Sequence, residues 1–257
     1  MIQKFLIKGG NPLNGEVEIS GYKNSAGALL SAALLSEEPS IIDNLPLCTD
    51  VIDQIDIIQQ MGGKIDWITE RKIKLDPKNL DPEKIPFGLF QKMRVSVLLI
   101  GPLLARFHNF KVPHPGGDKI GLRSIKIHLD ALKKFGAKVW EENGFYCFEA
   151  AGNLEGAYIV LQEFSVTATE IAMMVASLAK GITTIEIAAA EPQVQDLGAM
   201  LQKMGAKIKG VGTHTIEIEG KNKLSGAEHS VCPDPLETGK KSRKLLRSSR
   251  SKSCICS

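Results

Sequence analysis

Cysteine is scarce in this sequence, and no two cysteines have the CxxC spacing of a metal or redox motif. Their odd number among the 257 residues also argues against a disulfide framework. We therefore expect reduced thiols at Cys48, Cys147, Cys232, Cys254 and Cys256. The sequence shows no cluster of metal ligands and no Ser/His/Asp arrangement, so we expect neither a metal nor a cofactor.

A long apolar run is missing as well. The longest run, from Val95 to Ala105, is too short to cross a bilayer and contains Pro102. No charged-then-apolar leader opens the chain. These features predict a soluble, cytoplasmic protein without membrane contact.

Three similar segments recur at a spacing of about 70 residues. They read QQMGGKI around Gly62, KKFGAKV around Gly136 and QKMGAKI around Gly205. Each closes an amphipathic helix and leads into a strand. Alternating patterns predict further strands, namely GEVEIS, SIIDNL, FYCFEA, AYIVLQ, TTIEIA and THTIEIEG.

A second kind of helix precedes the amphipathic helix of each repeat. Its three copies are SAGALLSAALL from Ser25, VSVLLIGPLLA from Val95 and TEIAMMVASLA from Thr169, and they are apolar nearly all round. Such helices must be buried on every side, so other elements have to surround them. The predicted fold class is an inside-out α/β globule, with three βα repeats around three buried parallel helices.

Polar residues stand at the start of each buried helix. Lys23 and Asn24 precede the first helix, Arg94 the second, and Ser165 and Thr167 the third. In parallel helices these starts share one end of the domain, where free N–H groups and helix dipoles favour an anion. The alternative is three ordinary capped helices with exposed basic residues.

The stretch HPGGDKIGLRS, from His114 to Ser124, places an aspartate directly after a glycine pair. Glycine opens backbone conformations that other residues avoid. Asp118 then has three interpretations: a turn residue bonded to its own backbone, a carboxylate of a metal or anion site, or a proton donor on a loop. The local sequence by itself favours the turn.

The motifs of the chain extend well beyond single residues. They are FLIKGGNPLNGEVEISGYKNSAGALLSAALLSEEPSI, KMRVSVLLIGPLLARF, PGGDKIGLRSIKIHLDAL, SVTATEIAMMVASLAKG, AEPQVQDL, GTHTIEIEG and PDPLETG. Over about residues 1 to 239 they resemble the UDP-N-acetylglucosamine 1-carboxyvinyltransferases, a family of enolpyruvyl transferases. The PGGxxIGxR loop separates that family from the 5-enolpyruvylshikimate-3-phosphate synthases, which are the nearest alternative enzymes.

The resemblance implies two inside-out α/β barrel domains of the enolpyruvyl transferase type, with the site between them. Residues 23–232 match one complete three-repeat domain, 1–22 the first strand of an otherwise missing domain, and 233–239 the hinge. Seven of the last 18 residues are Lys or Arg and six are Ser, which predicts a disordered basic tail over 240–257. Because the likeness stops at Gly239, we interpret this tail as out-of-frame sequence; the alternative is a basic arm for nucleic acid or acidic lipid. A separate chain with the missing domain is a possible partner, and no nucleic acid is expected.

The resemblance also implies the transfer of the enolpyruvyl group of phosphoenolpyruvate to the 3′-hydroxyl of UDP-N-acetylglucosamine, which begins peptidoglycan precursor synthesis. Lys23, Arg94 and Arg123 match the cations that bind phosphoenolpyruvate, with Lys23 also in a catalytic role, and Asn24 matches a sugar contact. The family's catalytic base belongs to the part after ETG. We therefore expect the truncated chain to be inactive alone.

Within this family the position of Asp118 usually holds cysteine and in some members aspartate. Thiol and carboxylic acid share the capacity to deliver a proton when their pKa is raised. The resemblance thus reverses the preference for a turn and assigns Asp118 as the general acid. It also implies insensitivity to fosfomycin, because a carboxylate is a poor partner for epoxide alkylation.

Five residues match the nucleotide contacts and the hinge motif of the family. His128, Ser165, Val166 and Thr167 match contacts to the uridine and diphosphate, and Asp234 begins the hinge motif. Backbone donors at a helix start suit a diphosphate.

Two charges depart from the family pattern, because Lys126 stands where aspartate is common and Glu163 where lysine is common. An exchanged pair preserves a contact between neighbours, whereas a carboxylate near a diphosphate weakens binding.

Two other functional classes also stay open. One is a non-catalytic nucleotide-binding module. The other is a basic-tailed RNA-associated protein, although the sequence lacks the motifs of RNA 3′-phosphate cyclases.

Overall fold

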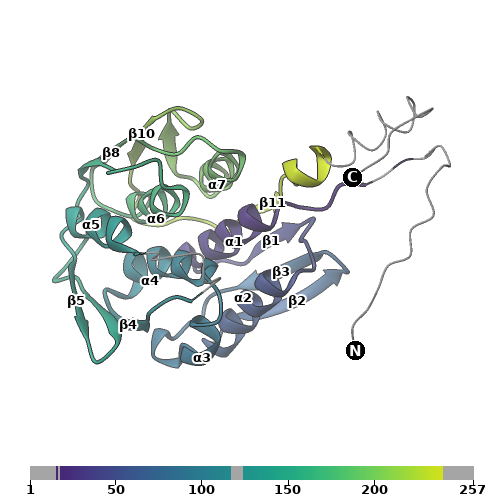
Figure 1. Ribbon diagram of the computed structural model, residues 1–257, viewed down its shortest axis with the longest axis horizontal. Coiled ribbons are helices and arrows are strands. Elements are labelled where there is room, and N and C mark those ends of the chain that lie inside the picture. Colours follow the sequence, from purple (N-terminus) through teal and green to yellow (C-terminus); the bar gives the residue numbers. More distant parts are fainter. Residues whose placement is uncertain (1–15, 17, 117–123, 240–257) are drawn as a thin grey trace, which may run out of the picture. The chain divides into compact units, whose positions relative to one another are not determined.

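The computed structural model describes residues 16, 18–116 and 124–239 (Figure 1). Residues 21–232 form one compact unit, and the described residues 18–20 and 233–239 belong to another. Asp118, Arg123 and the basic tail therefore lie outside the described residues. What the sequence predicts for them stays a prediction.

Three sheets correspond to the three predicted repeats. The first has the order β11 (Glu228–Ser230), β1 (Ser40–Asp43), β3 (Lys72–Asp76) and β2 (Lys64–Thr69). The second has the order β4 (Asn109–Pro113), β6 (Phe145–Glu149) and β5 (Lys138–Glu142). The third has the order β7 (Tyr158–Val160), β8 (Ile182–Glu186), β10 (Thr215–Glu219) and β9 (Lys207–Lys209).

Strand pairing is antiparallel except where β11 joins β1 and where β7 joins β8. Alternation along the strands separates a buried from an exposed face, as in β10, where Ile216 and Ile218 are buried between exposed threonine and glutamates. In the second sheet no parallel strand among the described residues pairs with β4 in the way that β11 pairs with β1 and β7 with β8. Instead it contacts the short helices η2 (Pro82–Lys84) and α3 (Phe87–Phe90).

The outer, amphipathic helix of each repeat ends at the glycine that the sequence repeats predict. These helices are α2 (Thr49–Gln60), α5 (Lys126–Lys134) and α7 (Pro192–Lys203). Gly62, Gly136 and Gly205 follow them with φ values of 99°, 93° and 105°. Glycine adopts this left-handed conformation without the steric cost of a Cβ atom, so it ends each helix before the next strand.

The inner helices are buried all round, as predicted. They are α1 (Lys23–Ala32) with the 3₁₀ turn η1 (Ala33–Leu35), the 3₁₀ segment η3 (Val95–Leu99) with α4 (Ile100–Phe107), and α6 (Val166–Ala176). Every residue of α6 from Ala168 onward is buried, and so is every residue of α1 from Ser25 onward. In Figure 1 the sheets and outer helices surround these three helices.

Two predicted elements differ from the structure. The apolar run from Val95 begins as a 3₁₀ helix, because Pro102 has no N–H to donate to the carbonyl of Leu98 and its ring crowds that carbonyl. The predicted strand GEVEIS forms no strand over residues 18–20. There the Ser20 N–H donates to the Glu237 carboxylate and the Ser20 carbonyl accepts from Asp234 N, so neither group is left for a ladder.

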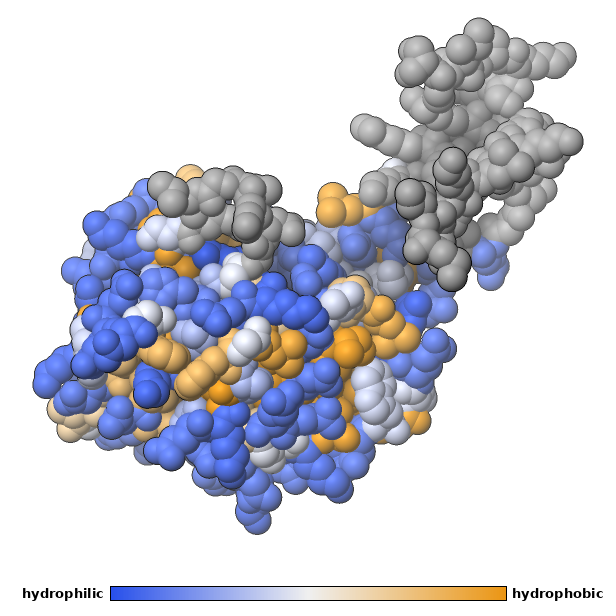
Figure 2. All heavy atoms as spheres, turned by 60° about the horizontal axis from the view of Figure 1, so that its bottom comes forward, coloured by the Kyte–Doolittle hydropathy of each residue, from blue (hydrophilic) through white to orange (hydrophobic). Residues whose placement is uncertain are grey.

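The surface is mainly hydrophilic on the face shown in Figure 2, with separate hydrophobic areas. Among the described residues, Leu47, Trp67 and Ile68 are large apolar side chains that are 46–51% exposed, and they border one open hollow. No helix in the described part of the chain has the length and apolar character needed to cross a bilayer.

Candidate functional site

A cavity of about 330 Å³ opens where the inner helices begin. Lys23 and Asn24 of α1 line it, together with Arg94 before η3 and Val166 and Thr167 of α6. Each of the three repeats thus contributes the first residues of its inner helix. The last residues of the same helices line a second cavity, so the three helices run parallel, as the sequence predicts.

The first turn of α6 supplies the polar groups on one side of the cavity. Ser165 caps the helix, since its hydroxyl accepts a hydrogen bond from Ala168 N at 3.4 Å. Thr169 is held through its hydroxyl, which donates to Ser165 O at 2.8 Å. The capping leaves other N–H groups of this first turn unpaired within the helix, and the residues beside them, Val166 and Thr167, face the cavity.

His128 and Thr167, both predicted from the sequence, lie together. His128 Nε2 is 2.7 Å from the Thr167 hydroxyl, and the ring is only 4% exposed. Burial, and secondly the positive charge of Arg94, lower the pKa of His128 to about 4. The imidazole is therefore neutral at pH 7, so it contributes a hydrogen-bonding group rather than a charge.

Lys23 and Arg94, two of the three cations that line the cavity, are held by partners that the sequence analysis did not identify. Lys23 Nζ lies 2.8 Å from the Asp50 carboxylate in the first turn of α2, and Arg94 donates to Ser124 O at 3.2 Å. Both side chains of the Lys23–Asp50 pair are more than a third exposed. Such a pair contributes little free energy, so an incoming anion can displace Asp50 at small cost.

Glu170 is a buried acid in the cavity wall, and the sequence analysis missed it. Its side chain is 1% exposed and Oε1 has no hydrogen-bond partner among the described residues. Burial first, and then the negative charge of Glu191, raise the pKa of Glu170 well above its ordinary value of 4.5. An acid within the apolar run of α6 was the only sequence signal.

Replacing Glu170 with glutamine is expected to stabilise the protein increasingly as the pH rises above 4.5. The folded state keeps a proton on Glu170 that the unfolded chain releases, so wild-type stability falls through that range up to the higher folded pKa. Glutamine does not titrate. Urea unfolding of both proteins at pH 5 and pH 8 measures the change, with the exposed Glu217→Gln as the control. A difference that is the same at both pH values would show that Glu170 is ionised.

Asp196 ties the start of α1 to α7 and to the end of β11, and it too was missed. The Ser25 hydroxyl donates to Asp196, His229 Nε2 lies 2.8 Å from Oδ1, and Cys232 N donates to Oδ2 at 2.9 Å. Burial acts to raise the pKa of Asp196, but the hydrogen bonds from His229, Ser25 and Cys232 lower it below its ordinary value. The network fixes the helical turn that carries Lys23.

Asp234, predicted in the hinge motif, belongs to the smaller unit. Its carboxylate accepts from Leu236 N at 2.8 Å and from Glu237 N at 3.2 Å, so it caps the helical residues 235–239.

Lys126 and Glu163, the two charges that depart from the family pattern, form no ion pair with each other. The exchange of their signs therefore does not preserve a direct contact. No group of three or more potential metal ligands occurs in the described ranges.

Both flanks of the segment that carries Asp118 approach residues 91–94. A Cβ atom on Gly116 would lie 1.6 Å from Gln91 O, so only glycine permits this approach. At the other flank, the carbonyl of Ser124 accepts the hydrogen bond from Arg94. Gly116 and Ser124 thus both lie beside the stretch that supplies Arg94 to the cavity.

The comparisons agree with the motifs in the sequence. The family model of EPSP synthase (3-phosphoshikimate 1-carboxyvinyltransferase) matches residues 7–240. A UDP-N-acetylglucosamine 1-carboxyvinyltransferase of Treponema denticola is 45% identical over 93% of this chain and 55% of its own length. Its counterpart in Glaesserella parasuis is 43% identical over 93% of this chain and 56% of its own length. The predicted resemblance is confirmed, and the chain spans about half the length of these relatives.

Solved structures share the fold. The enolpyruvyl transferase NikO from Streptomyces tendae superposes with a TM-score of 0.76 at 22% identity, covering 90% of this chain and 54% of that one. An EPSP synthase from Acinetobacter baumannii gives a TM-score of 0.68 at 19% identity, covering 86% and 51%. The predicted inside-out α/β fold of the enolpyruvyl transferase type is therefore confirmed.

Proposed function

The chain belongs to the EPSP synthase family, and from that membership we propose that its larger unit binds substrates for an enolpyruvyl transfer. The substrates are phosphoenolpyruvate and UDP-N-acetylglucosamine, by analogy with the relatives from Treponema denticola and Glaesserella parasuis. The reaction would begin peptidoglycan precursor synthesis. The single observation that carries the proposal is the cavity that joins Lys23 and Arg94 to the start of α6.

The cavity suits an anionic substrate for two physical reasons. Lys23 and Arg94 bring positive charge, and the ends of three inner helices present N–H groups with partial positive charge. Phosphate and carboxylate groups bind to such arrangements through charge-assisted hydrogen bonds. We assign Lys23, Arg94 and Arg123 to phosphoenolpyruvate, with Lys23 also stabilising charge during the reaction.

The nucleotide sugar is assigned to the side of the cavity formed by α6. Val166 and Thr167 lie at its helix start, Ser165 caps it, and His128 bonds Thr167 as a neutral group. A neutral imidazole and backbone N–H groups suit a diphosphate and a uracil without an additional charge. Asn24 of α1 is assigned to the sugar.

The proposed chemistry is an addition followed by an elimination. The sugar 3′-oxygen bonds to C2 of phosphoenolpyruvate while C3 receives a proton from Asp118, and a base takes the proton of the hydroxyl. Loss of a proton from C3 then expels phosphate from C2 and restores the double bond. The base is not assigned to any residue of this chain.

We further propose where the chain divides. Residues 23–232 form the three-repeat domain, 1–22 supply a strand to a second domain, and 233–239, with Asp234, form the hinge. The chain spans about half the length of these relatives. We propose that the rest of that length closes the site, whichever chain carries it. Residues 240–257 are proposed to stay unpacked.

Calorimetric titration with UDP-N-acetylglucosamine tests the proposal directly. Saturable binding that weakens in Thr167→Ala is expected, because that change removes the partner of His128 and a polar group of the cavity. Thr215→Ala, on the exposed face of β10, is the matched control. Binding of shikimate 3-phosphate in place of the nucleotide sugar would assign the chain to the EPSP synthase branch instead.

Neutralising Lys23 and Arg94 should weaken phosphoenolpyruvate binding in the presence of the nucleotide sugar. Each charge-assisted hydrogen bond contributes about 1.5–3 kcal/mol, so Lys23→Ala should lower the affinity about 10- to 100-fold. Arg94→Ala should act similarly. The exposed Lys207→Ala, whose side chain pairs with Glu219 on β10, controls for net charge. Unchanged affinity in both site variants would contradict the assignment.

A further inference from the structure

Two polar side chains in the wall of the proposed substrate cavity are buried without a protein partner. Glu170 of α6 is 1% exposed and Gln193 of α7 is 5% exposed, and both line the cavity. Neither side chain makes a hydrogen bond or an ion pair with any described residue. Buried polar groups in proteins nearly always have partners, because an unpaired group destabilises the folded state. These two side chains therefore differ from ordinary core residues.

The position of Glu170 on its helix directs the carboxyl group to the cavity. Glu170 follows Thr167 by three residues, so the two side chains share one face of α6. Side chains of a helix tilt toward its N-terminus, which is the end where the cavity opens. Thr167 is half-buried and Glu170 is buried, so the carboxyl group lies deeper in the same wall.

Gln193 stands at a position that faces the cavity in all three repeats. Asp50, Ser124 and Gln193 each lie twelve residues before the glycine that ends the outer helix of their repeat. In the first repeat this residue forms an ion pair with Lys23, and in the second its carbonyl accepts a hydrogen bond from Arg94. In the third repeat no described residue pairs with the side chain. The same local geometry thus leaves the amide of Gln193 available at the cavity.

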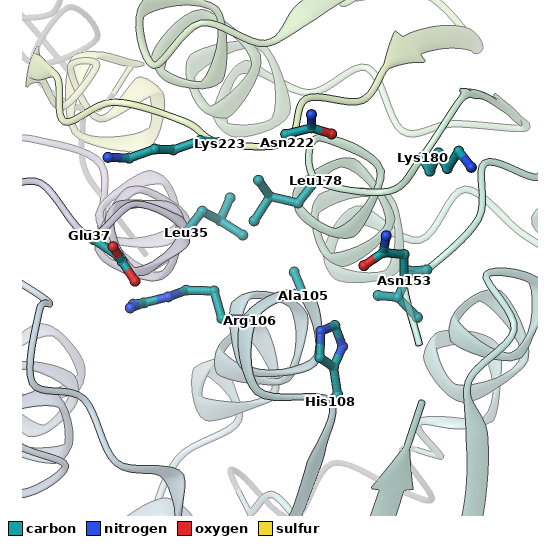
Figure 3. Close-up of a pocket in the computed structure, with 11 residues that line it drawn as sticks. Leu35, Glu37, Ala105, Arg106, His108, Asn153, Leu178, Lys180, Asn222 and Lys223 are labelled. Carbon is teal, nitrogen blue, oxygen red and sulfur yellow. The ribbon is translucent and has the colours of Figure 1, made fainter. Parts of the chain in front are cut away.

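The cavity at the other ends of the inner helices, drawn in Figure 3, has no comparable feature. Its polar side chains Asn153, Lys180 and Asn222 are exposed, so water completes their hydrogen bonds and no ligand is indicated. Glu170 and Gln193 have almost no contact with solvent. A group of a bound ligand can reach both of them, because they line the same space.

The chemistry of the two side chains suits an uncharged group. The raised pKa of Glu170 favours the protonated acid, which donates one hydrogen bond and accepts others. The amide of Gln193 also donates and accepts. Lys23 and Arg94 line the same cavity and bind phosphate and carboxylate groups more strongly than neutral side chains do. Hydroxyl and amide groups, which combine a donor with an acceptor, are the matching partners of the neutral pair.

We propose that Glu170 and Gln193 recognise the amino sugar of the nucleotide substrate through its hydroxyl or acetamido groups. This inference rests on the proposed function, and it adds two contacts to the sugar contact assigned to Asn24. Before the sugar binds, the two side chains have no protein partner, so apolar side chains of similar shape would make the free protein more stable. The sugar provides the missing partners, and an analogue without it does not.

Calorimetric titration of the full chain with UDP-N-acetylglucosamine, and with UDP, which lacks the sugar, tests the pair. Glu170→Met and Gln193→Met approximate the volume of the original side chains and remove their hydrogen bonds. Each should weaken UDP-N-acetylglucosamine binding about three- to tenfold, the contribution of a neutral hydrogen bond, and leave UDP binding unchanged. UDP-glucose, with a hydroxyl in place of the acetamido group, separates the two sources. An acetamido contact predicts equal UDP-glucose affinity in variants and parent, and a hydroxyl contact predicts the same weakening as before.

Two further variants separate recognition from a structural role. Gln195→Met, at an exposed position of α7, is the matched control and should change neither affinity. Glu170→Gln keeps a donor and an acceptor, so it should bind the nucleotide sugar like the parent. In thermal unfolding, Glu170→Met and Gln193→Met should be at least as stable as the parent, since they remove unpaired buried polar groups.

The results distinguish this inference from the proposed function. Unchanged UDP-N-acetylglucosamine affinity in both cavity Met variants would overturn the recognition of the sugar. Equal weakening of UDP and UDP-N-acetylglucosamine binding would overturn it as well, because the effect would not come from the sugar. In either case the parent chain still binds the nucleotide sugar, so the proposed function stands. A parent chain that does not bind UDP-N-acetylglucosamine would contradict the proposed function and this inference together.

Discussion

Replacing Asp196 with alanine is expected to lower the free energy of unfolding by about 3 kcal/mol, because three buried or half-buried donors lose this acceptor at about 1 kcal/mol or more each. The lowered pKa makes Asp196 a carboxylate at neutral pH, which only accepts hydrogen bonds. His229 Nε2 must therefore carry a proton toward Oδ1, and the Ser25 hydroxyl and Cys232 N–H donate as well. Equilibrium urea unfolding measures the loss.

The effect should be specific to this buried network. Asp66→Ala removes an exposed carboxylate that pairs with Lys64 on β2, and it is expected to change stability little. Asp196→Asn keeps the shape and one acceptor but loses the charge, so it should fall between the two. An Asp196→Ala protein as stable as Asp66→Ala would show that the hydrogen bonds contribute no net free energy.

The repeated architecture could be predicted because local and global signals coincide in it. Gly62, Gly136 and Gly205 stand at the same point of three similar segments, and each has the left-handed backbone that ends a helix. The inner helices were recognised because an apolar pattern on every side admits only a buried position. The meeting of Lys23, Arg94 and Thr167 then followed from the parallel direction of those helices.

Partners that come from distant parts of the chain were not predictable from the sequence. Asp196 lies 171 residues from Ser25, and only the fold brings them into contact. The pairing of Asp50 with Lys23 was not predicted, because a carboxylate in the first turn of a helix is already explained by its favourable interaction with the helix dipole. Glu170 resembles any acid in a helix until burial and the proximity of Glu191 raise its pKa.

Asp118→Asn is expected to reduce turnover by about 10²–10⁴-fold, the contribution of a general acid. The proposed reaction needs a proton at C3 of phosphoenolpyruvate, and an amide of the same shape has none to give. The described flanks of its segment lie beside the stretch that supplies Arg94: Gly116 fits closely against Gln91, and Ser124 accepts from Arg94.

This variant is best measured in a chimaera that joins residues 1–239 to the remaining part of the Treponema denticola relative, which supplies the rest of the family's length. Phosphate release in the presence of both substrates gives kcat, and calorimetry gives the affinity for UDP-N-acetylglucosamine. The acid role requires a lower kcat with unchanged nucleotide affinity, because the carboxyl acts on the other substrate. Asp130→Asn, in the partly exposed pair with Lys133 on α5, is the matched control. A kcat for Asp118→Asn within a few-fold of this control would remove Asp118 from the chemistry and return it to a turn.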